Sequence, residues 1–502
     1  MTIERSANAA WFPGGPILSR RNLLRQAGWL AAAGVVSPLA RLAGQAPGPA
    51  ISPVMARLSA YMSEARSRAL PDEVAEKAKH HILDTIAAMI SGADLPPGRA
   101  AIAFAREYRG AQVATVAGSN VVCGPIEAAL ANGVMAHADE TDDSHGPSRS
   151  HPGAAVLPAA LALGEQYGID GTHFLRAVVL GYDVGTRVSM AIGGPAYQTA
   201  TRRSTHATAG TFCAAAAAGC AASLDARQMR LLLDYASQQS SGIGAWQRDT
   251  DHIEKAFVFG GMTSRSGVTA ALLVRAGWTG VEDVFSGQDN FFEAYRPQAN
   301  PADLIEALGE RYEVVRTNIK KWSVGSPLQA PLDGLEMMFR QRPFGADDVQ
   351  KVVVRLANDE VVTVNNREIP DISLQHMVAV MLLDKTVSFA VAHDKERMKD
   401  PAVLRQRAKV ELLSDPQIDA RRPRRECIIE VTLNDGTQLR EWIRDVRGTA
   451  DNPMPRAEVV AKCRDLIAPV LGAAQCDRLI ASLLAIENVR NVRELRPFLR
   501  RA

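Results

Sequence analysis

The sequence is poor in aromatic residues, in paired cysteines and in long apolar runs. Aromatic residues make up 5% of the 502 residues, whereas alanine and leucine are abundant, which favours helices over strands. The cysteines contain no C-x-x-C pair and no zinc-ligand spacing, which excludes a zinc finger or a disulfide framework. We expect six buried small side chains at Cys123, Cys213, Cys220, Cys427, Cys463 and Cys476.

The net charge is small outside the first 50 residues. The formal net charge is +2, yet this opening segment alone carries five arginines against one acid, Glu4. The remainder is therefore slightly acidic and has no basic footprint for a nucleic acid, so we expect no nucleic-acid partner. A composition of 47% hydrophobic and 22% charged residues is that of a globular protein with room for two or three domains.

The first 50 residues are typical of an export signal. Residues 19–25, S-R-R-N-L-L-R, form a twin-arginine signature, and an apolar run over 27–40 and small residues near 43–46 follow it. The run is shorter than the roughly 20 residues that span a bilayer, and we expect no later span. The alternative is a basic amphipathic first helix. We expect a removable signal peptide, export by the Tat machinery to the periplasm or beyond, and no membrane attachment afterwards.

Apolar residues recur at helical spacing in the first half of the remaining chain, and strand patterns appear only later. Helical runs are predicted over 153–168, 171–192 and 209–222, and Gly181 and Gly185, one turn apart, indicate close helix contact. Asp225 and Gln228 form a capping box for the next helix. The histidines His80 and His81 are expected at the surface.

After Pro301, the alternation of apolar residues predicts strands and a hairpin, with helices at 373–383 and 401–408 between them. The hairpin turn is residues 434–437, N-D-G-T. We therefore predict a mainly α fold with an all-helical domain over 51–298, a smaller α+β domain over 299–450, and C-terminal helices over 451–502 that return to the helical domain. The predicted strands are 349–356, 409–413, 427–433 and 438–443.

The densest polar segment runs from His137 to His151 between two apolar helices. It contains four carboxylates and three histidines, and such a loop cannot be buried without partners. Three interpretations stay open on these residues alone: a solvated loop, a divalent metal site, or an acid–base active site. We favour the acid–base site, because the metal interpretation finds no support from a metal-binding motif. That metal site would use Asp142, Asp143, His145 and His151.

The order of short motifs along residues 53–500 resembles the MmgE/PrpD family, whose members include 2-methylcitrate dehydratase, cis-aconitate decarboxylase and iminodisuccinate epimerase. Each motif is weak alone, but their order is specific. The motifs are N-G at 132–133, H at 137, T-D-D-S-H at 141–145, H-P-G at 151–153, G-Y-D-V-G-T-R at 181–187, A-G-T-F at 209–212, K at 255, G-G at 260–261, G-V-T-A-A-L-L at 267–273, G-W-T-G at 277–280, I-K-K-W at 319–322 and S-L-Q-H at 373–376.

The resemblance implies a helical domain with a smaller α+β lid domain, an active site between them, homodimers, and neither a metal nor an organic cofactor. Carried over by position, the family's loop carboxylate falls on Glu140, its loop threonine on Ser144 and its H-P-G histidine on His151. Its two lysines fall on Lys255 and Lys320.

Two positions depart from the family pattern. The family's second histidine aligns with Ser204, whereas this chain has a histidine two places later, at His206. The family's tyrosine aligns with His376. His206 could instead cap its helix, and His376 could be a core residue.

The chemistry of the family assigns roles to these residues. An enolate-like intermediate requires fixed positive charge, which Lys255 and Lys320 could supply, with Arg187 as either a third cation or a structural ion pair. A base must titrate near the working pH, so His151 or His206 is expected to abstract the proton. Acidic loop residues would orient a histidine or deliver a proton. The expected substrate-binding residues are Asp142, Asp143, His145, Arg187 and His376.

These assignments predict a cofactor-independent lyase that removes a proton next to a carboxylate of a small di- or tricarboxylate. We expect a dehydratase. The alternatives are a decarboxylase, an epimerase or isomerase of a related polycarboxylate, and, from another class, a catalytically silent periplasmic protein that binds carboxylates.

Overall fold

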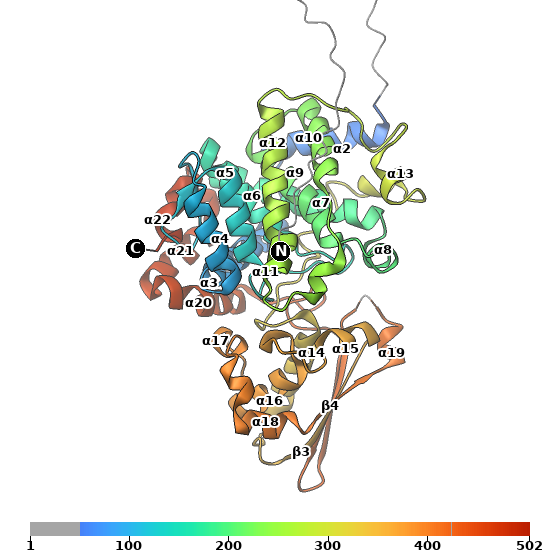
Figure 1. Ribbon diagram of the computed structural model, residues 1–502, viewed down its shortest axis with the longest axis vertical. Coiled ribbons are helices and arrows are strands. Elements are labelled where there is room, and N and C mark those ends of the chain that lie inside the picture. Colours follow the sequence, from blue (N-terminus) through green and yellow to red (C-terminus); the bar gives the residue numbers. More distant parts are fainter. Residues whose placement is uncertain (1–50, 423, 502) are drawn as a thin grey trace, which may run out of the picture. The chain divides into compact units, whose positions relative to one another are not determined.

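Long apolar stretches with few β-branched residues form helices from Pro53 onwards. The computed structural model describes residues 51–422 and 424–501, so the predicted signal segment lies outside the described residues. Figure 1 shows the helical part. Its helices are α2 (Pro53–Glu64), α3 (Asp72–Gly92), α4 (Pro96–Glu107), α5 (Pro125–Ala136), α6 (Pro152–Tyr167), α7 (Gly171–Ala191), α8 (Gly194–Thr201), α9 (Thr205–Ala221), α10 (Ala226–Gln239), α11 (Ile253–Ala256), α12 (Met262–Arg275) and α13 (Phe291–Tyr295), with a short hairpin of β1 (Ala114–Thr115) and β2 (Val122–Cys123).

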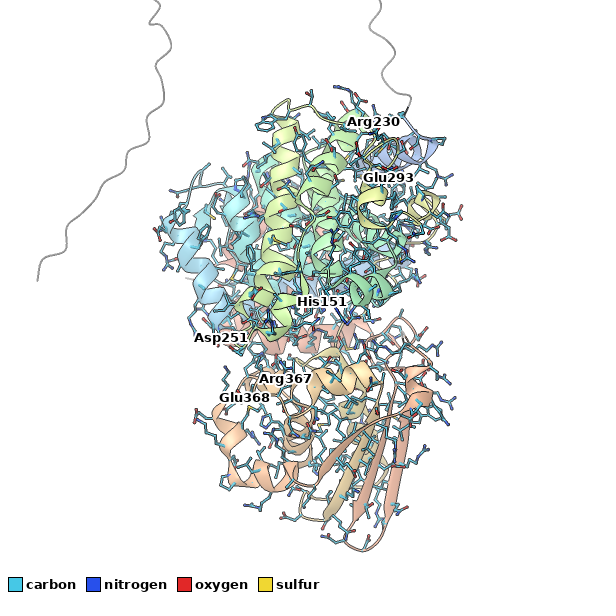
Figure 2. The ribbon with its side chains drawn as sticks, turned by 45° about the vertical axis from the view of Figure 1, so that its right-hand side comes forward. His151, Arg230, Asp251, Glu293, Arg367 and Glu368 are labelled. Atoms are coloured by element: carbon cyan, nitrogen blue, oxygen red, sulfur yellow. The ribbon has the colours of Figure 1, made fainter. Side chains whose placement is uncertain are left out.

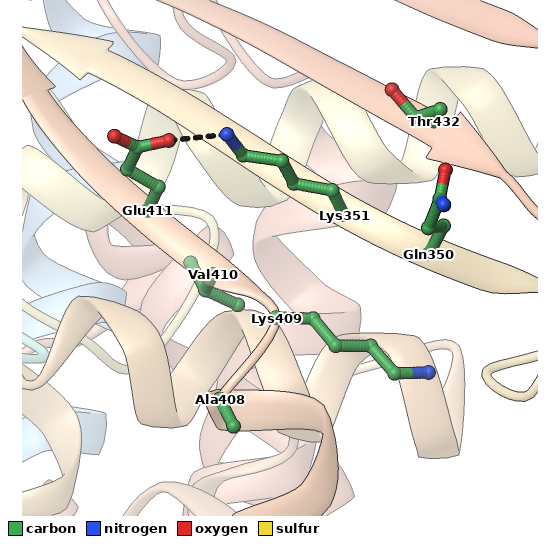
Figure 3. Close-up of a pocket in the computed structure, with 7 residues that line it drawn as sticks. All are labelled: Gln350, Lys351, Ala408, Lys409, Val410, Glu411 and Thr432. Atoms are coloured by element: carbon green, nitrogen blue, oxygen red, sulfur yellow. Dashed lines mark ion pairs between the residues drawn. The ribbon is translucent and has the colours of Figure 1, made fainter.

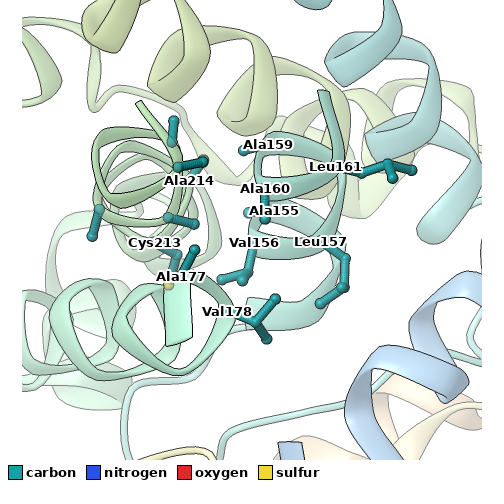
Figure 4. Packing of buried hydrophobic residues seen from close by; sticks show 14 of the residues in the cluster. Ala155, Val156, Leu157, Ala159, Ala160, Leu161, Ala177, Val178, Cys213 and Ala214 are labelled. Carbon is teal, nitrogen blue, oxygen red and sulfur yellow. The ribbon is translucent and has the colours of Figure 1, made fainter. Parts of the chain in front are cut away.

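The alanine-rich helix α9 is the centre of the helical core. All of its residues are buried, and it packs against α6, α7 and α12 (Figure 4). The predicted close contact at Gly181 and Gly185 is confirmed: a Cβ on Gly181 would lie 2.9 Å from the carbonyl oxygen of Cys213, and one on Gly185 would collide with the α9 backbone. Small side chains thus let helices approach closely enough to give a dense, rigid support for the loops at their ends.

The predicted strands are confirmed and form a four-stranded mixed sheet in the order β4-β3-β5-β6. The pair β3–β4 is parallel and the other two pairs are antiparallel. Helices α14 and α16 pack on this sheet, as Figure 1 shows. The elements are β3 (Val349–Leu356), β4 (Val410–Ser414), β5 (Cys427–Leu433), β6 (Gln438–Ile443), α14 (Ser326–Gln341), α15 (Asn358–Val364), α16 (Leu374–Asp384), α17 (Phe389–Ala392), α18 (Pro401–Arg407) and α19 (Pro416–Asp419). The mainly α fold with a small mixed-sheet domain is therefore as predicted.

The last helices are α20 (Arg456–Leu471), α21 (Ala473–Leu484) and α22 (Arg496–Leu499), and both α20 and α21 pack against α3. Lys462 on α20 bonds to the buried carboxylate of Asp84 at 2.6 Å. All six cysteines are buried and free, as predicted. The continuous helix Ile253–Arg275 is long and apolar enough to cross a membrane, which the sequence analysis did not expect. Of its most apolar stretch, 67% is buried within the fold, as in the core helix of a protein.

Candidate active site

The loop from His137 to His151 is anchored by Asp143 to the helical core. The carboxylate of Asp143 accepts hydrogen bonds from Gly153 N at 3.0 Å and from the Tyr182 hydroxyl at 2.5 Å, and it lies 2.9 Å from His81 Nδ1. A Cβ at Gly153 would lie 2.8 Å from both Asp143 and Tyr182, so only glycine fits the H-P-G motif here. The structure therefore assigns Asp143 to protein anchoring and corrects its prediction as a substrate-binding residue.

His80 and His81 were expected at the surface, but their exposed fractions are only 6% and 0%. That prediction is wrong. Both faces of α3 pack against neighbouring elements. The spacing of apolar residues in the sequence therefore could not show that these two polar residues are buried.

His145 fixes a tight turn and is also one of the residues that line the cleft described below. Its Nδ1 lies 2.8 Å from Ser148 Oγ and its Nε2 lies 3.2 Å from the buried carboxylate of Glu313. Its backbone N and O also pair with Ser150. Both ring nitrogens are thus paired with protein groups, and the expected binding of substrate by His145 stays a prediction.

Asp142 lies between two histidines, one oxygen towards each. Its Oδ2 is 2.9 Å from His137 Nδ1 and its Oδ1 is 3.0 Å from His151 Nδ1. Because a carboxylate accepts, the Nδ1 of each ring donates in these contacts, and a neutral His151 keeps a free lone pair on Nε2. His151 is the first residue before α6, its side chain is 11% exposed, and Figure 2 shows it at the lower end of the helical bundle. Both oxygens of Asp142 thus contact histidines, so Asp142 would influence a substrate through these histidines rather than by direct contact.

The electrostatics of this pair suit a base. Burial lowers the pKa of the His151 imidazole, an effect that Asp142 partly opposes, so the ring is neutral at neutral pH. Burial raises the pKa of the Asp142 carboxyl, but His137 and His151 outweigh it and hold that pKa well below its usual range.

Glu140 lies between the two predicted lysines. Lys255 Nζ forms an ion pair with its carboxylate, and Lys320 Nζ donates to its backbone oxygen at 2.7 Å and lies 3.8 Å from its Oε2. Burial raises the pKa of the Glu140 carboxyl, but Lys255 and Lys320 outweigh burial and hold it well below its usual value. Lys320 also lies 3.6 Å from Asp142 Oδ1, so it links Glu140 to the His151 pair.

Ser144 connects this loop to the segment that carries Lys320. Its backbone N and O pair with Asn318 at 3.0 and 2.9 Å. The serine side chain lines the cleft described below.

The second histidine of the site, His206, stands in the first turn of α9. Ser204 is the residue that caps this helix, through a bond from Ala207 N at 3.3 Å, so the capping interpretation of His206 is wrong. The His206 ring stacks on Phe259 with centroids 3.8 Å apart and lies 5.4 Å from the His151 ring. Burial lowers the pKa of His206 well below its usual value, and His151 lowers it further.

Phe259 belongs to an unusual turn. Residues Phe257–Gly261 form a π-helical turn between α11 and α12, a geometry that is rare and concentrated at functional sites. Gly260 within it meets the backbone of Gly133 so closely that neither could carry a Cβ. This contact explains the N-G motif and lets Phe259 reach both His206 and the His137 ring, 4.5 Å away.

His151 and His206 open onto a cleft of about 590 Å³ that also contains Ser144. Its lining is strongly cationic, with one acid, Asp451, among its residues. The arginines that line it are Arg149, Arg316, Arg422, Arg424, Arg425 and Arg444. Of these, four come from the segment around β5 and β6, so the cleft joins the helical part to the α+β part of the described chain.

Seven predicted residues do not line this cleft: Glu140, Asp142, Asp143, Lys255 and Lys320, and also Arg187 and His376. Arg187 is 1% exposed and donates to the backbone oxygens of Glu306 and Arg311 at 2.5 and 2.8 Å. His376 is fully buried within α16, where burial lowers its pKa to about 4. The structure thus corrects the prediction that these two side chains bind substrate.

The open pocket in Figure 3 lies on the strands of the sheet and contains none of the predicted site residues. Lys351 and Glu411 form an ion pair of 2.6 Å across it.

The residues that could hold a metal ion in the structure differ from the set considered from the sequence, which was Asp142, Asp143, His145 and His151. His137, Asp142 and His151, and also His137, Glu140 and His252, place candidate ligand atoms within 4.8 Å of one another. Asp143 and His145 belong to neither group. Lys255 and Lys320 already neutralise Glu140, so a divalent cation would have to displace a cation from either group.

Sequence reasoning missed His252, His393 and the arginines. Burial lowers the pKa of His252 to about 3, and its ring lies 5.3 Å from that of His137. His393, after α17, approaches Asp139 at 3.0 Å and ties the loop to the α+β part. The cluster R-R-P-R-R at 421–425 was a visible signal, because so many arginines before a buried strand need an anionic partner.

Comparisons with known proteins identify the family of this chain. The MmgE/PrpD N-terminal domain matches residues 56–303 and the MmgE/PrpD C-terminal domain matches residues 322–487. Cis-aconitate decarboxylase-like protein oryM of Aspergillus oryzae is 26% identical over 483 residues, covering 88% of this chain and 96% of that protein. Cis-aconitate decarboxylase of Aspergillus terreus is 22% identical, covering 88% and 95%. The human cis-aconitate decarboxylase is 25% identical, covering 84% and 89%. The chain therefore belongs to the MmgE/PrpD family, whose matched members here are lyases.

Proposed function

We propose that the chain is a lyase that transfers a proton at the carbon next to a carboxylate of a small di- or tricarboxylate. One observation carries the proposal: the neutral His151, oriented by Asp142, opens onto a cleft lined by arginines. A neutral imidazole beside fixed cations is suited to removing a proton and stabilising the enolate-like charge that results. The proposal needs neither a metal nor an organic cofactor.

Dehydration is the reaction that this arrangement favours. His151 Nε2 takes the proton from the carbon, the C–H electrons form the new double bond, and the C–O bond breaks. The hydroxyl leaves as water with the proton that His151 returns. Lys320, which lies 3.6 Å from Asp142 Oδ1, and Lys255, which pairs with Glu140 beside it, hold the carboxylate next to the reacting carbon.

Decarboxylation is the second candidate, and the printed names of the relatives favour it. In that reaction the C–C bond to a carboxylate breaks, CO2 leaves, and the electron pair takes a proton from an acid. Because both His151 and His206 have lowered pKa values, an acid must first be protonated, whereas a base is ready at once. For this reason we rank dehydration above decarboxylation as the proposed reaction.

The test is a substrate panel read for both products. The mature protein is incubated with citrate, isocitrate, 2-methylcitrate and cis-aconitate, and the formation of unsaturated acid and of CO2 is followed separately. Unsaturated acid without CO2 supports dehydration, and CO2 supports the second candidate. No reaction with any member contradicts the proposed lyase.

A protein that only binds carboxylates is the alternative from another class. The variants His151→Ala, Glu140→Gln and Lys255→Ala separate the two, because a binding protein needs the cation but not the base. Loss of turnover with retained binding in His151→Ala supports the enzyme; binding lost only in Lys255→Ala, with no turnover in the unchanged protein, supports the binding protein.

Export and dimer formation are further proposals that rest on the sequence and the family resemblance. We expect the chain to reach the periplasm through its twin-arginine segment, and Arg20→Lys with Arg21→Lys to retain it inside the cell on fractionation. Light scattering of the mature protein should give twice the mass of the chain.

A further inference from the structure

One arginine of the cleft is held in a strained turn. Arg149 has φ +49°, a left-handed conformation that residues other than glycine rarely adopt. The turn is nevertheless firmly fixed: Arg149 N donates to Gly146 O at 3.0 Å, and its own carbonyl accepts from Thr205 Oγ1 at 2.8 Å. Strain of this kind in a well-supported turn indicates that the position of the side chain matters.

The side chain of Arg149 has no anionic partner within the described residues. No carboxylate of the described chain lies within 4.0 Å of its guanidinium, and the described residues accept no hydrogen bond from it, although the residue is half-buried. Burial lowers the pKa of this guanidinium, Asp359 opposes the effect, and Arg425 and Arg422 lower it further. An anion in the cleft would relieve both the burial and the repulsion.

The other cleft arginines divide into two groups. Arg422 and Arg425 both pair with Glu360 at 2.8 Å, Arg316 pairs with Glu313 at 2.9 Å, and Arg424 lies 4.0 Å from Asp445. Arg444, directly after β6, instead lies over the Trp442 ring at 4.3 Å and, like Arg149, has no carboxylate partner among the described residues. The compensated arginines are part of the framework, whereas Arg149 and Arg444 keep charge available for a ligand.

We propose that Arg149, together with Arg444, forms a second anion subsite that binds a substrate carboxylate remote from the reacting carbon. The subsite selects tricarboxylates over dicarboxylates. The inference rests on the proposed function for the reacting end, which His151 and the two lysines serve. A planar guanidinium that can bind a carboxylate through two parallel N–H bonds is the group best suited to such selection.

The test is calorimetric binding of tricarballylate and of glutarate, which lacks the central carboxylate of tricarballylate. In Arg149→Gln the Kd for tricarballylate should rise about tenfold to a hundredfold, the range for a hydrogen bond to a charged group, while the Kd for glutarate stays unchanged. Arg149→Gly should show the same selectivity loss without strain in the turn, so misfolding cannot explain the result.

Arg202→Gln is the matched control, because Arg202 also has a left-handed φ, +61°, and is exposed outside this cleft. It should change neither Kd. Equal weakening of both ligands in Arg149→Gln, no weakening of either, or the same loss in Arg202→Gln would overturn the subsite. Turnover of the substrate panel can persist in each of those cases, so failure of the subsite is distinguishable from failure of the lyase proposal.

Discussion

Asp142 and Asp143 are neighbours in sequence and carry the same chemical group, yet the structure gives them opposite surroundings. Each lies about 3 Å from a histidine Nδ1, Asp142 from His151 and Asp143 from His81. The His151 side chain is 11% exposed and opens onto the arginine-lined cleft, whereas His81 is fully buried beside Tyr182. The comparison teaches that a histidine–carboxylate pair becomes a candidate catalyst through access to ligand, not through its own geometry.

The largest difference should appear on replacing each histidine. His151→Asn keeps a donor near Asp142 but has no Nε2 lone pair, so kcat should fall about 10²- to 10⁴-fold, the usual contribution of a general base. His81→Asn should leave kcat nearly unchanged and lower the free energy of unfolding by about 1–3 kcal/mol, because it disturbs a buried hydrogen bond. Steady-state kinetics and denaturant unfolding measure the two effects.

Equal losses of kcat in both histidine variants, after correction for the folded fraction, would break the comparison. The two pairs would then contribute alike to activity, and access to the cleft would not distinguish them.

Replacing Asp142 and Asp143 should give the same contrast between lost activity and lost stability as replacing the two histidines, with smaller losses of kcat. Asp142→Asn cannot accept from both His137 and His151, so kcat should fall about a hundredfold with little change in KM. Asp143→Asn should mainly reduce stability, by about 1–3 kcal/mol, because the Gly153 N–H or the Tyr182 hydroxyl loses an anionic acceptor. An Asp143→Asn enzyme that is fully stable but inactive would contradict the assignment of activity to Asp142 and of stability to Asp143.

The pH dependence sharpens the comparison further. Burial lowers the pKa of His151, so the neutral base persists below the ordinary histidine value of 6.5, and kcat/KM should decline only at more acidic pH. Asp142 raises that pKa, so Asp142→Asn should move the acidic limb to still lower pH. The control is Asp143→Asn, which should leave the limb in place, and a limb that is identical in all three proteins would exclude His151 as the titrating base.

The smallest effect on chemistry should come from Gly153→Ala. The added Cβ would lie 2.8 Å from the Asp143 carboxylate and the Tyr182 hydroxyl, so thermal unfolding should show a loss of about 1–3 kcal/mol. The folded fraction should keep most of its kcat, because the collision lies on the Asp143 side of the loop. A loss of kcat as large as that of His151→Asn would show that the two sides are mechanically coupled.

Much of this arrangement was readable from the sequence. Helical spacing predicted the helices around Gly181 and Gly185, and the N-D-G-T turn predicted the β5–β6 hairpin because both signals are local. The polar loop was predicted to be a site because its charges required partners. Local patterns could not distinguish Asp142 from Asp143, since burial of their partners depends on α3 and α7, which are far away in sequence.

The remaining errors have the same cause. Arg187 and His376 were assigned to the substrate by residue type, but their surroundings are set by the backbone carbonyls of Glu306 and Arg311 and by the interior of α16. His206 was predicted as a catalytic residue from the sequence, but its alternative role as a helix cap could be excluded only once Ser204 was seen to cap α9.

Proton exchange in D2O tests the central claim most directly. The mature protein, His151→Asn and His81→Asn are each incubated with the polycarboxylate panel in D2O and followed by proton NMR. The account predicts deuterium at a carbon next to a carboxylate with the unchanged protein and with His81→Asn, and at least a hundredfold slower exchange with His151→Asn. Exchange by His151→Asn at the unchanged rate, or no exchange with any panel member, would contradict it.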